Sequence, residues 1–195
     1  MRNAISRSLA AALLVAGSGL AGCKVAEEDE VATETEQAGS KTVAAALAED
    51  DNLGAARDAL EQAGLLTLLD GVGSYTLLAP NDTAFEGLGP RSGKLMQEDQ
   101  RPVLVAVLRE HILPGHVTTA AIAEAIEQQG NSVKMTTVGG GQVSFAREGE
   151  RITATGPSGN TVNLVGEGAS AGNGALLTLD GVLMPAASAE RSSDQ

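Results

Sequence analysis

The stretch GSYTLLAPNDTAFEGL, residues 73–88, changes its pattern in the middle and decides how the chain folds. Its apolar first half, Tyr75–Ala79, favours a buried β-strand. Pro80 lacks the backbone N–H that a strand ladder needs, so the strand should end there. Asn81 or Asp82 can then accept amide protons at the start of a helix. The stretch therefore predicts a strand that leads directly into a capped helix, a structural corner in preference to a ligand site.

Three short helices are expected before this corner. Thr42 can cap a helix that runs through Ala48, and Asn52 can cap a second helix that ends at Gly64. Four apolar residues recur on one face of this second helix, namely Leu53, Ala56, Leu60 and Ala63. A third helical turn, residues 65–69, completes the series.

A longer helix is expected after the corner, with Asp99 as its cap and Pro102 in its first turn. Its inner face should hold four apolar residues, Val103, Leu104, Val107 and Leu108. Residues 111–119 should cross the molecule in extended form, and Thr119 can cap a further helix that ends near Glu127.

From Ser132 the pattern changes to short β-rich segments separated by glycine-rich turns. The segments are residues 133–138, 142–146, 151–155, 161–165 and 175–184. Such close spacing predicts an antiparallel meander, in which Asp180-Gly181 forms a turn that redirects Val182 and Leu183. Because helices come first and strands later, the sequence predicts an α+β fold instead of repeated βαβ units.

The composition restricts the functions that the chain can have. Hydrophobic residues make up 43% of the 195 residues, but there are only two Phe, one Tyr and no Trp, so the core must be aliphatic. A formal net charge of −12 argues against a nucleic-acid partner, because binding to phosphates needs clustered Lys and Arg.

The sequence offers few residues or motifs suited to catalysis. Two His and one Cys cannot make the usual zinc site of three or four ligands. The glycine clusters lie between strands, without the Lys-Ser or Lys-Thr of a phosphate-binding loop. The acidic residues lack the spacing of a calcium loop. We therefore predict no catalytic, metal-binding or cofactor-binding residues and no enzyme activity.

The N-terminus has the pattern of a secretory signal. Two arginines precede an apolar run, Leu9–Leu20, that is too short to span a bilayer. The sequence LAGC that ends at Cys23 resembles the lipobox of bacterial lipoprotein precursors. This resemblance implies that residues 1–22 are removed and that acyl chains on Cys23 attach the protein to a membrane. An ordinary signal peptide with an unrelated cysteine is the alternative.

Residues 23–40 contain the predicted lipid attachment site and then six carboxylates without an aromatic residue, a composition that stays solvated and extended. We expect a flexible acidic tether here, and a binding tail is the alternative. Residues 186–195 should form a disordered tail. Lys24 follows the cysteine, where the sorting rule of some double-membrane bacteria favours the outer membrane. The expected location is therefore the bacterial cell envelope, at the periplasmic face or the cell surface.

Residues 41–185 resemble a single fasciclin (FAS1) domain along essentially their whole length. Three ordered signature blocks carry the resemblance: Tyr75, Thr76, Pro80, Asp82 and Phe85 in the first, His111, Pro114 and Gly115 in the second, and Asn173, Gly174, Asp180 and Pro185 in the third. The resemblance implies a wedge-shaped β-sandwich with a flanking bundle of short helices, and mainly structural roles for these residues. We expect the closing strand to pair beside Tyr75–Ala79.

Four positions depart from the family pattern. Glu110 replaces the Tyr of the second block, and Leu177 replaces a His of the third. Gly168-Ala169 stands where animal adhesion members have Asp-Ile, a proposed integrin contact. The resemblance therefore does not extend to integrin recognition.

His111 has two interpretations. Because imidazole titrates near neutrality, it can sense pH or contact a partner. We favour a structural histidine that is hydrogen-bonded inside the fold, with Asp82 as its expected partner. His116 should lie on an exposed turn.

Two functions remain after these exclusions. The resemblance implies a non-enzymatic adhesion or interaction module that contacts cells, matrix, polysaccharide or another protein outside the membrane. The alternative is an envelope protein that binds a small molecule or lipid in a cleft between helices and sheet, which an aliphatic composition permits. A local scaffolding role in the envelope cannot be distinguished from either by sequence.

Overall fold

The computed structural model describes residues 41–186. The predicted signal peptide (1–22), the predicted lipidation site Cys23 and the rest of the tether lie outside the described residues, as does the predicted tail from residue 187 onward. The predicted fasciclin domain, residues 41–185, falls within the described residues.

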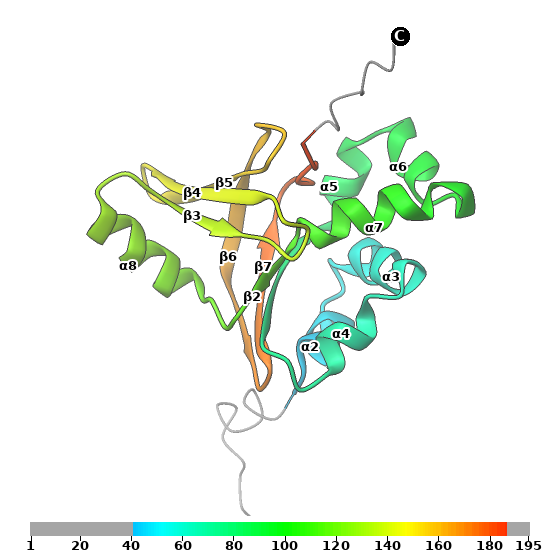
Figure 1. The fold of residues 1–195 in the computed structure, drawn as a ribbon, viewed down its shortest axis with the longest axis horizontal. Helices are drawn as coiled ribbons and strands as arrows, with labels where there is room; N and C mark the ends of the chain where they lie inside the picture. Colours follow the sequence, from blue (N-terminus) through cyan, green and yellow to red (C-terminus); the bar gives the residue numbers. More distant parts are fainter. Residues whose placement is uncertain (1–40, 187–195) are drawn as a thin grey trace, which may run out of the picture. The chain divides into compact units, whose positions relative to one another are not determined.

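Seven strands form one hydrogen-bonded series (Figure 1). They are β1 (Tyr75–Pro80), β2 (Ile112–Pro114), β3 (Ser132–Thr136), β4 (Gln142–Glu148), β5 (Arg151–Thr155), β6 (Thr161–Ala171) and β7 (Gly174–Leu179). Their spatial order is β2-β1-β7-β6-β5-β4-β3. Strands β3 to β7 make the predicted antiparallel meander. Strand β1 pairs in parallel with β7, so the predicted pairing of the closing strand with Tyr75–Ala79 is confirmed.

The helices before β2 lie on one side of the strands (Figure 1). They are α2 (Val43–Glu49), α3 (Gly54–Ala63), α4 (Leu66–Asp70), α5 (Asp82–Gly87), α6 (Pro90–Leu95), the 3-10 helix η1 (Glu98–Gln100) and α7 (Arg101–Arg109). A further helix, α8 (Thr119–Gln129), lies on the other side, against β3 and β4. The strands are therefore covered by helices on both sides.

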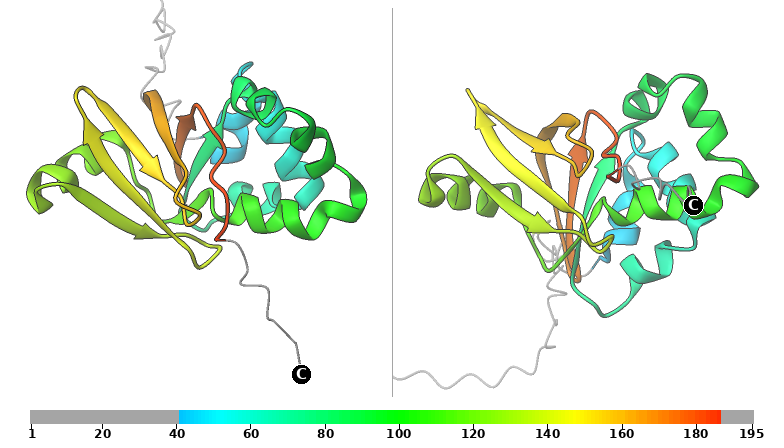
Figure 2. Two further views of the ribbon diagram at one scale, coloured as in Figure 1. Left: turned by 90° about the horizontal axis from the view of Figure 1, so that it is seen from above. Right: turned by 45° about the horizontal axis from the view of Figure 1, so that its top comes forward.

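Two main apolar clusters hold these layers together. The first joins the helices to β1 and β7, and Leu60, Leu77 and Leu104 are among its buried side chains. The second includes Leu113 from β2, Val133 from β3, Phe145 from β4 and residues of α8. Because both ends of the strand series contribute to this second cluster, the sheet folds over itself into a sandwich, which Figure 2 shows from two further directions. The predicted α+β sandwich with a helical flank is confirmed.

The predicted boundaries of the first two helices are partly correct. Thr42 caps α2 by accepting a hydrogen bond from the backbone N–H of Ala45, as predicted. Gly64 ends α3 in the left-handed conformation, with φ of 75°, also as predicted. The prediction that Asn52 caps α3 is wrong, because its side-chain amide donates to Asp50 instead. Leu53 occupies the cap position of α3 and has no side-chain group to offer.

The predicted cap residues of the later helices, Asp99 and Thr119, are wrong, and each lies one residue from the observed cap position. Asp99 lies inside η1, where its carboxylate accepts from the Gln100 side chain, and it caps no helix. Thr118 caps α8 in place of Thr119, whose hydroxyl donates to the carbonyl oxygen of Glu167 at 2.8 Å. Two adjacent threonines are equally good candidates by sequence, and only the three-dimensional contacts decide between them.

One predicted core residue of α7 lies on the surface. Leu104, Val107 and Leu108 are buried, at the three- and four-residue spacing of a helix face. Val103 precedes this stripe by one residue and is therefore rotated by about 100° from it. It is 47% exposed, so its predicted place on the inner face is wrong.

Candidate functional site

The corner that follows β1 holds the starts of two helices. Asn81 Oδ1 accepts from the N–H of Ala84 at 2.8 Å and so caps α5, as the sequence predicts. Asp82 Oδ1 accepts from the N–H of Ala55 at 2.8 Å, at the beginning of α3. A carboxylate at that place satisfies an otherwise unpaired donor and also interacts favourably with the helix dipole. The first signature block therefore uses its polar side chains inside the fold.

His111 is completely buried, and both of its ring nitrogens have partners. The backbone N–H of Leu183 donates to Nε2 at 2.9 Å, and Nδ1 lies 2.9 Å from the carbonyl oxygen of Val107. Since Nε2 accepts, we place the proton of the neutral ring on Nδ1, where it donates to Val107. Burial lowers the pKa of His111 to about 4, against the smaller opposing effect of the Val107 bond. The neutral ring is therefore the form that the fold holds.

The predicted hydrogen bond between Asp82 and His111 is wrong. The Asp82 carboxylate accepts from Ala55, whereas the His111 ring bonds to Val107 and Leu183. His111 is nevertheless a histidine that is hydrogen-bonded inside the fold, which was the favoured interpretation.

Thr76 connects β1 to the segment after β2. Its side chain is fully buried, donates to the carbonyl oxygen of Gly115 at 2.8 Å and accepts from the N–H of Val117 at 2.7 Å. Gly115 has φ of 95°, a conformation that favours glycine. The neighbouring Tyr75 is half-buried, and Pro114 is exposed at the end of β2. These residues of the first two signature blocks thus lie side by side where β1 pairs with β2.

Phe85 and Pro80 complete the first block in the core. Phe85 is buried in the cluster that joins helices and strands, and Pro80 is the last residue of β1. Their positions agree with a strand that ends at the corner and a helix that turns its ring inward.

Asn173 is the most connected side chain of the third block. Its Oδ1 accepts from the N–H of Val43 at 2.8 Å, and its Nδ2 lies 2.8 Å from the carbonyl oxygens of both Leu69 and Gly71. The adjacent Gly174 lies against β1 so closely that a Cβ there would overlap the carbonyl of Tyr75. The turn between β6 and β7 is therefore tied to α2, α4 and β1.

Asp180 closes the turn that follows β7. Its two carboxylate oxygens accept from the N–H and the side-chain amide of Asn163, each at 2.7 Å. After this turn Leu183 is buried in the second core cluster and Val182 in a third, smaller cluster, so the turn redirects them as predicted. Pro185 follows, half-buried, near the end of the described residues.

Two departures from the family pattern have structural partners. Glu110 is buried, and its Oε2 accepts from the hydroxyl of Thr137 at 2.6 Å. Gly139 and Gly141 cover its carboxylate so tightly that a Cβ at either position would overlap it. Leu177 is buried in the second core cluster, where an apolar side chain fits.

An open groove of about 520 Å³ lies beside the start of α8, between that helix and strands β5 and β6. Its lining includes Thr119, Arg147, Ile152, Ala169, Ser170 and Leu177. His116 is exposed, as predicted, and its Nε2 lies 2.9 Å from the hydroxyl of Ser170 at the same end of β6. The groove is therefore mixed in polarity and open to solvent.

Gly168 shapes one wall of this groove. The register of β6 against β7 shifts between Val165 and Ala169, and Gly168 lies in this irregular segment with φ of 75°. A Cβ at Gly168 would also overlap the Leu177 side chain and come within 2.8 Å of the carbonyl oxygen of Leu176. An aspartate would therefore not fit at this position without a change in the backbone.

Within residues 41–186, no group of three or more His, Cys, Asp or Glu side chains is placed to hold a metal ion. None of the helices described there is long and apolar enough to cross a membrane.

These signature contacts agree with a comparison to known families. A family model described as the fasciclin domain matches residues 51–185. The chain belongs to the fasciclin family. Fasciclin domains commonly act as adhesion or interaction modules.

A solved structure similar to this fasciclin protein is a FAS1 domain pair from the insect cell adhesion molecule Fasciclin I. The TM-score is 0.64 and the sequence identity is 17%, so the similarity concerns the fold. It covers 74% of this chain and 51% of the other, so this chain spans about half of the insect pair.

Proposed function

We propose that this protein is a lipid-anchored component of the bacterial cell envelope, whose fasciclin domain acts as a non-enzymatic adhesion or interaction module. Acyl chains on Cys23 would hold it at a membrane, the acidic segment before Lys41 would act as a tether, and the exterior of the domain would contact a protein or polysaccharide. The outer membrane is the proposed location.

One observation supports this proposal above the others. The polar signature side chains Thr76, Asp82, His111, Asn173 and Asp180 all make hydrogen bonds inside the fold. A histidine that is fully buried and hydrogen-bonded at both nitrogens has no free position from which to exchange a proton with a substrate. What remains for function is the exterior of the domain.

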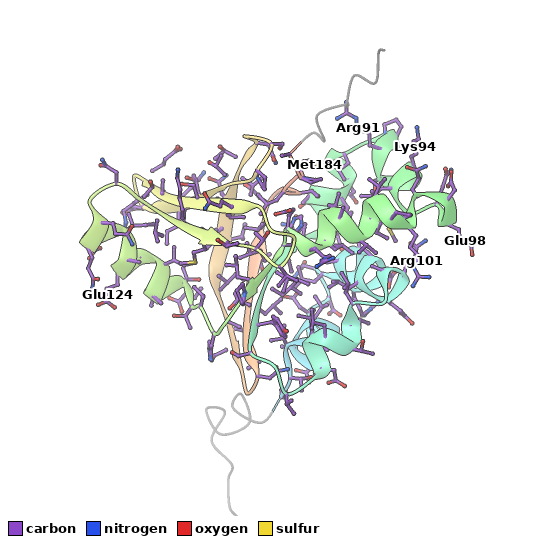
Figure 3. The ribbon with its side chains drawn as sticks, viewed as in Figure 1. Arg91, Lys94, Glu98, Arg101, Glu124 and Met184 are labelled. Atoms are coloured by element: carbon purple, nitrogen blue, oxygen red, sulfur yellow. The ribbon has the colours of Figure 1, made fainter. Side chains whose placement is uncertain are left out.

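That exterior carries charges of both signs. The side chains along the outer edge of α6, η1 and α7 include Arg91, Lys94, Glu98 and Arg101, and Glu124 lies on α8 (Figure 3). All of them are exposed or partly exposed polar groups outside the two core clusters. A mixed surface of this kind is suited to polar contacts with a protein or polysaccharide, and many copies on one membrane would add weak contacts through avidity.

Attachment of whole cells tests the proposal. A strain that lacks this gene should adhere or aggregate less, and the wild-type gene should restore adhesion. A Cys23→Ser form, produced in equal amounts, should restore it poorly because the protein is no longer held at the cell. Unchanged adhesion of the deletion strain under several growth conditions would contradict the proposed function.

The groove beside α8 supports a second candidate, an envelope protein that binds a small molecule or lipid. Its floor includes the apolar side chains of Ile152, Ala175 and Leu177. Native mass spectrometry of the protein purified from its own cells tests this candidate. A lipid or small molecule of defined mass would support it, and ligand-free protein after purification in mild detergent would count against it.

A further inference from the structure

The point at which the tether would enter the fold is held by a compact set of hydrogen bonds. The carbonyl oxygen of Lys41 accepts from the N–H of Gly172 at 2.7 Å, and the N–H of Val43 donates to Asn173 Oδ1 at 2.8 Å. Between them, the hydroxyl of Thr42 donates to Asp70 Oδ1 at 2.8 Å. Three consecutive residues are thus bonded to elements that lie far away along the chain.

Asn173 joins these bonds into one unit. While its Oδ1 holds Val43, its Nδ2 is placed to donate to the carbonyl oxygens of Leu69 and Gly71, at the end of α4. Its own carbonyl oxygen accepts from the N–H of Tyr75 at the start of β1. We call the set of Lys41, Thr42, Val43, Asp70, Gly172 and Asn173 the junction clamp.

The junction clamp protects the first helix of the domain. Val43 and Leu47 of α2 are completely buried in the cluster that joins the helices to β1 and β7. If the chain were pulled from its N-terminal end, α2 would be the first helix to separate, and its departure would expose that cluster to water. Short terminal elements are the parts of a fold that open locally most easily, unless specific contacts hold them.

The ion pair at the same place contributes little. Lys41 Nζ lies 2.7 Å from Glu49 Oε2, but the two side chains are 42% and 59% exposed. Water and salt screen a pair of this kind, so it adds little resistance. The neutral, partly buried hydrogen bonds of Asn173 are the stronger part of the junction clamp.

We propose that the junction clamp is a device that resists mechanical force and keeps α2 attached when tension between a membrane anchor and a bound partner pulls on the tether. The biological use of this device rests on the proposed anchoring at Cys23, whereas its mechanical action does not. A bound partner holds the domain, the anchor holds the membrane, and the force passes through Lys41. Asn173 distributes that force over α4, β1 and the β6–β7 turn instead of leaving it on α2.

Single-molecule force spectroscopy can test this directly, because the chain contains one cysteine. The mature chain without lipid is coupled through the Cys23 thiol and held by a tag at its C-terminus, so that force enters at the proposed anchor point. In a second geometry, a Cys23→Ser chain carries Gly93→Cys, and force enters on α6. A Cβ at Gly93 meets no atom within 4 Å, so this exposed position accepts the substitution.

Asn173→Ala should speed unfolding at constant force on the order of tenfold or more when force enters at Cys23, since three hydrogen bonds of this amide are lost. The same variant should have a clearly smaller effect when force enters at position 93. Asn160→Ala is the matched control, because this amide donates to the carbonyl oxygen of Val182 and accepts from the N–H of Met184, outside the junction clamp. It should speed unfolding equally in both geometries.

Equal acceleration by Asn173→Ala in the two geometries would overturn the proposal, since it would show a general loss of stability. If Asn173→Ala does not fold, as judged by circular dichroism, Asn173→Asp takes its place. This variant keeps the acceptor for Val43 and loses the donor to Leu69 and Gly71, and it is held to the same comparison. If Cys23 carries no lipid in cells, the junction clamp has no membrane tension to resist there, but the unfolding rates measured under force stay the same.

Discussion

Acidification should destabilise this domain through a single buried imidazole. The fold lowers the pKa of His111 to about 4, because burial disfavours the charged ring, and its ordinary value is 6.5. Below pH 6.5 the unfolded chain therefore binds a proton that the folded chain does not bind until the pH falls to about 4. The free energy of unfolding must fall as the pH decreases through this window.

The size of the effect follows from the difference between the two pKa values. Each pH unit inside the window costs about 1.4 kcal/mol, which gives a loss of about 2 kcal/mol between pH 7.5 and pH 5.0. The hydrogen bond to Nε2 also predicts that protonation destabilises the fold. Protonation of Nε2 would place a ring N–H against the N–H of Leu183, which now donates to that nitrogen at 2.9 Å. Full protonation would cost about 3 kcal/mol, a large part of the stability of a domain of this size.

Urea unfolding at these two pH values, followed by circular dichroism because the chain has no Trp, measures the loss. Both values lie above the isoelectric point of about 4.5. His116→Gln is the matched control and should keep the wild-type loss, because His116 is exposed. His111→Gln should be less stable at pH 7.5 and should lose less stability on acidification.

An equal loss of unfolding free energy on acidification in wild type and His111→Gln would show that protonation of His111 does not cause it. If His111→Gln does not fold, titration of the imidazole signals by NMR in the wild-type chain gives the answer. A pKa of His111 near 6.5 in the folded state would show the same in that case.

The remaining predictions concern single contacts, and each is measured by urea unfolding at pH 7.5. Asp82→Ala should cost about 1 kcal/mol because α3 loses its cap, and Asp82→Asn, which keeps an acceptor, should cost less; equal costs would contradict the cap. Gly168→Ala should cost about 3 kcal/mol, from its positive φ and the overlap with β7. Gly140→Ala has a positive φ but open space around it, and should cost only about 1 kcal/mol; similar losses for the two would refute the role of the overlap. Leu104→Ala should lower the free energy of unfolding by about 2–5 kcal/mol and Val103→Ala by less than about 0.5 kcal/mol. A larger loss for Val103→Ala would show that Leu104 does not lie on the inner face of α7.

Features that depend on neighbouring residues could be predicted from the sequence. Thr42 and Gly64 bound their helices as expected, since a cap and a left-handed glycine act within one helical turn. The meander of β3 to β7 followed from alternating segments and glycine-rich turns. The pairing of the closing strand beside Tyr75–Ala79 was expected, but its parallel direction was not, and local pattern alone predicts neither.

Contacts between distant residues could not be predicted in this way. Asp82 caps a helix whose first turn lies 27 residues earlier, and a cap of that kind leaves no local pattern. His111 bonds to the backbone of Leu183, 72 residues later, and any residue type at position 183 would offer the same N–H. The connections of Asn173 to α2 and α4 were missed for the same reason. A polar side chain next to a glycine suggests a turn, but it does not show which groups the Asn173 amide binds.

Metabolic labelling of cells with an alkyne fatty acid, followed by separation of membranes from soluble material, shows whether Cys23 carries a lipid anchor. The wild-type protein should carry the label and sediment with membranes, and the Cys23→Ser form should be unlabelled and soluble. An unlabelled wild-type protein that is released into the soluble fraction would contradict the claim that this fasciclin domain works from a lipid anchor.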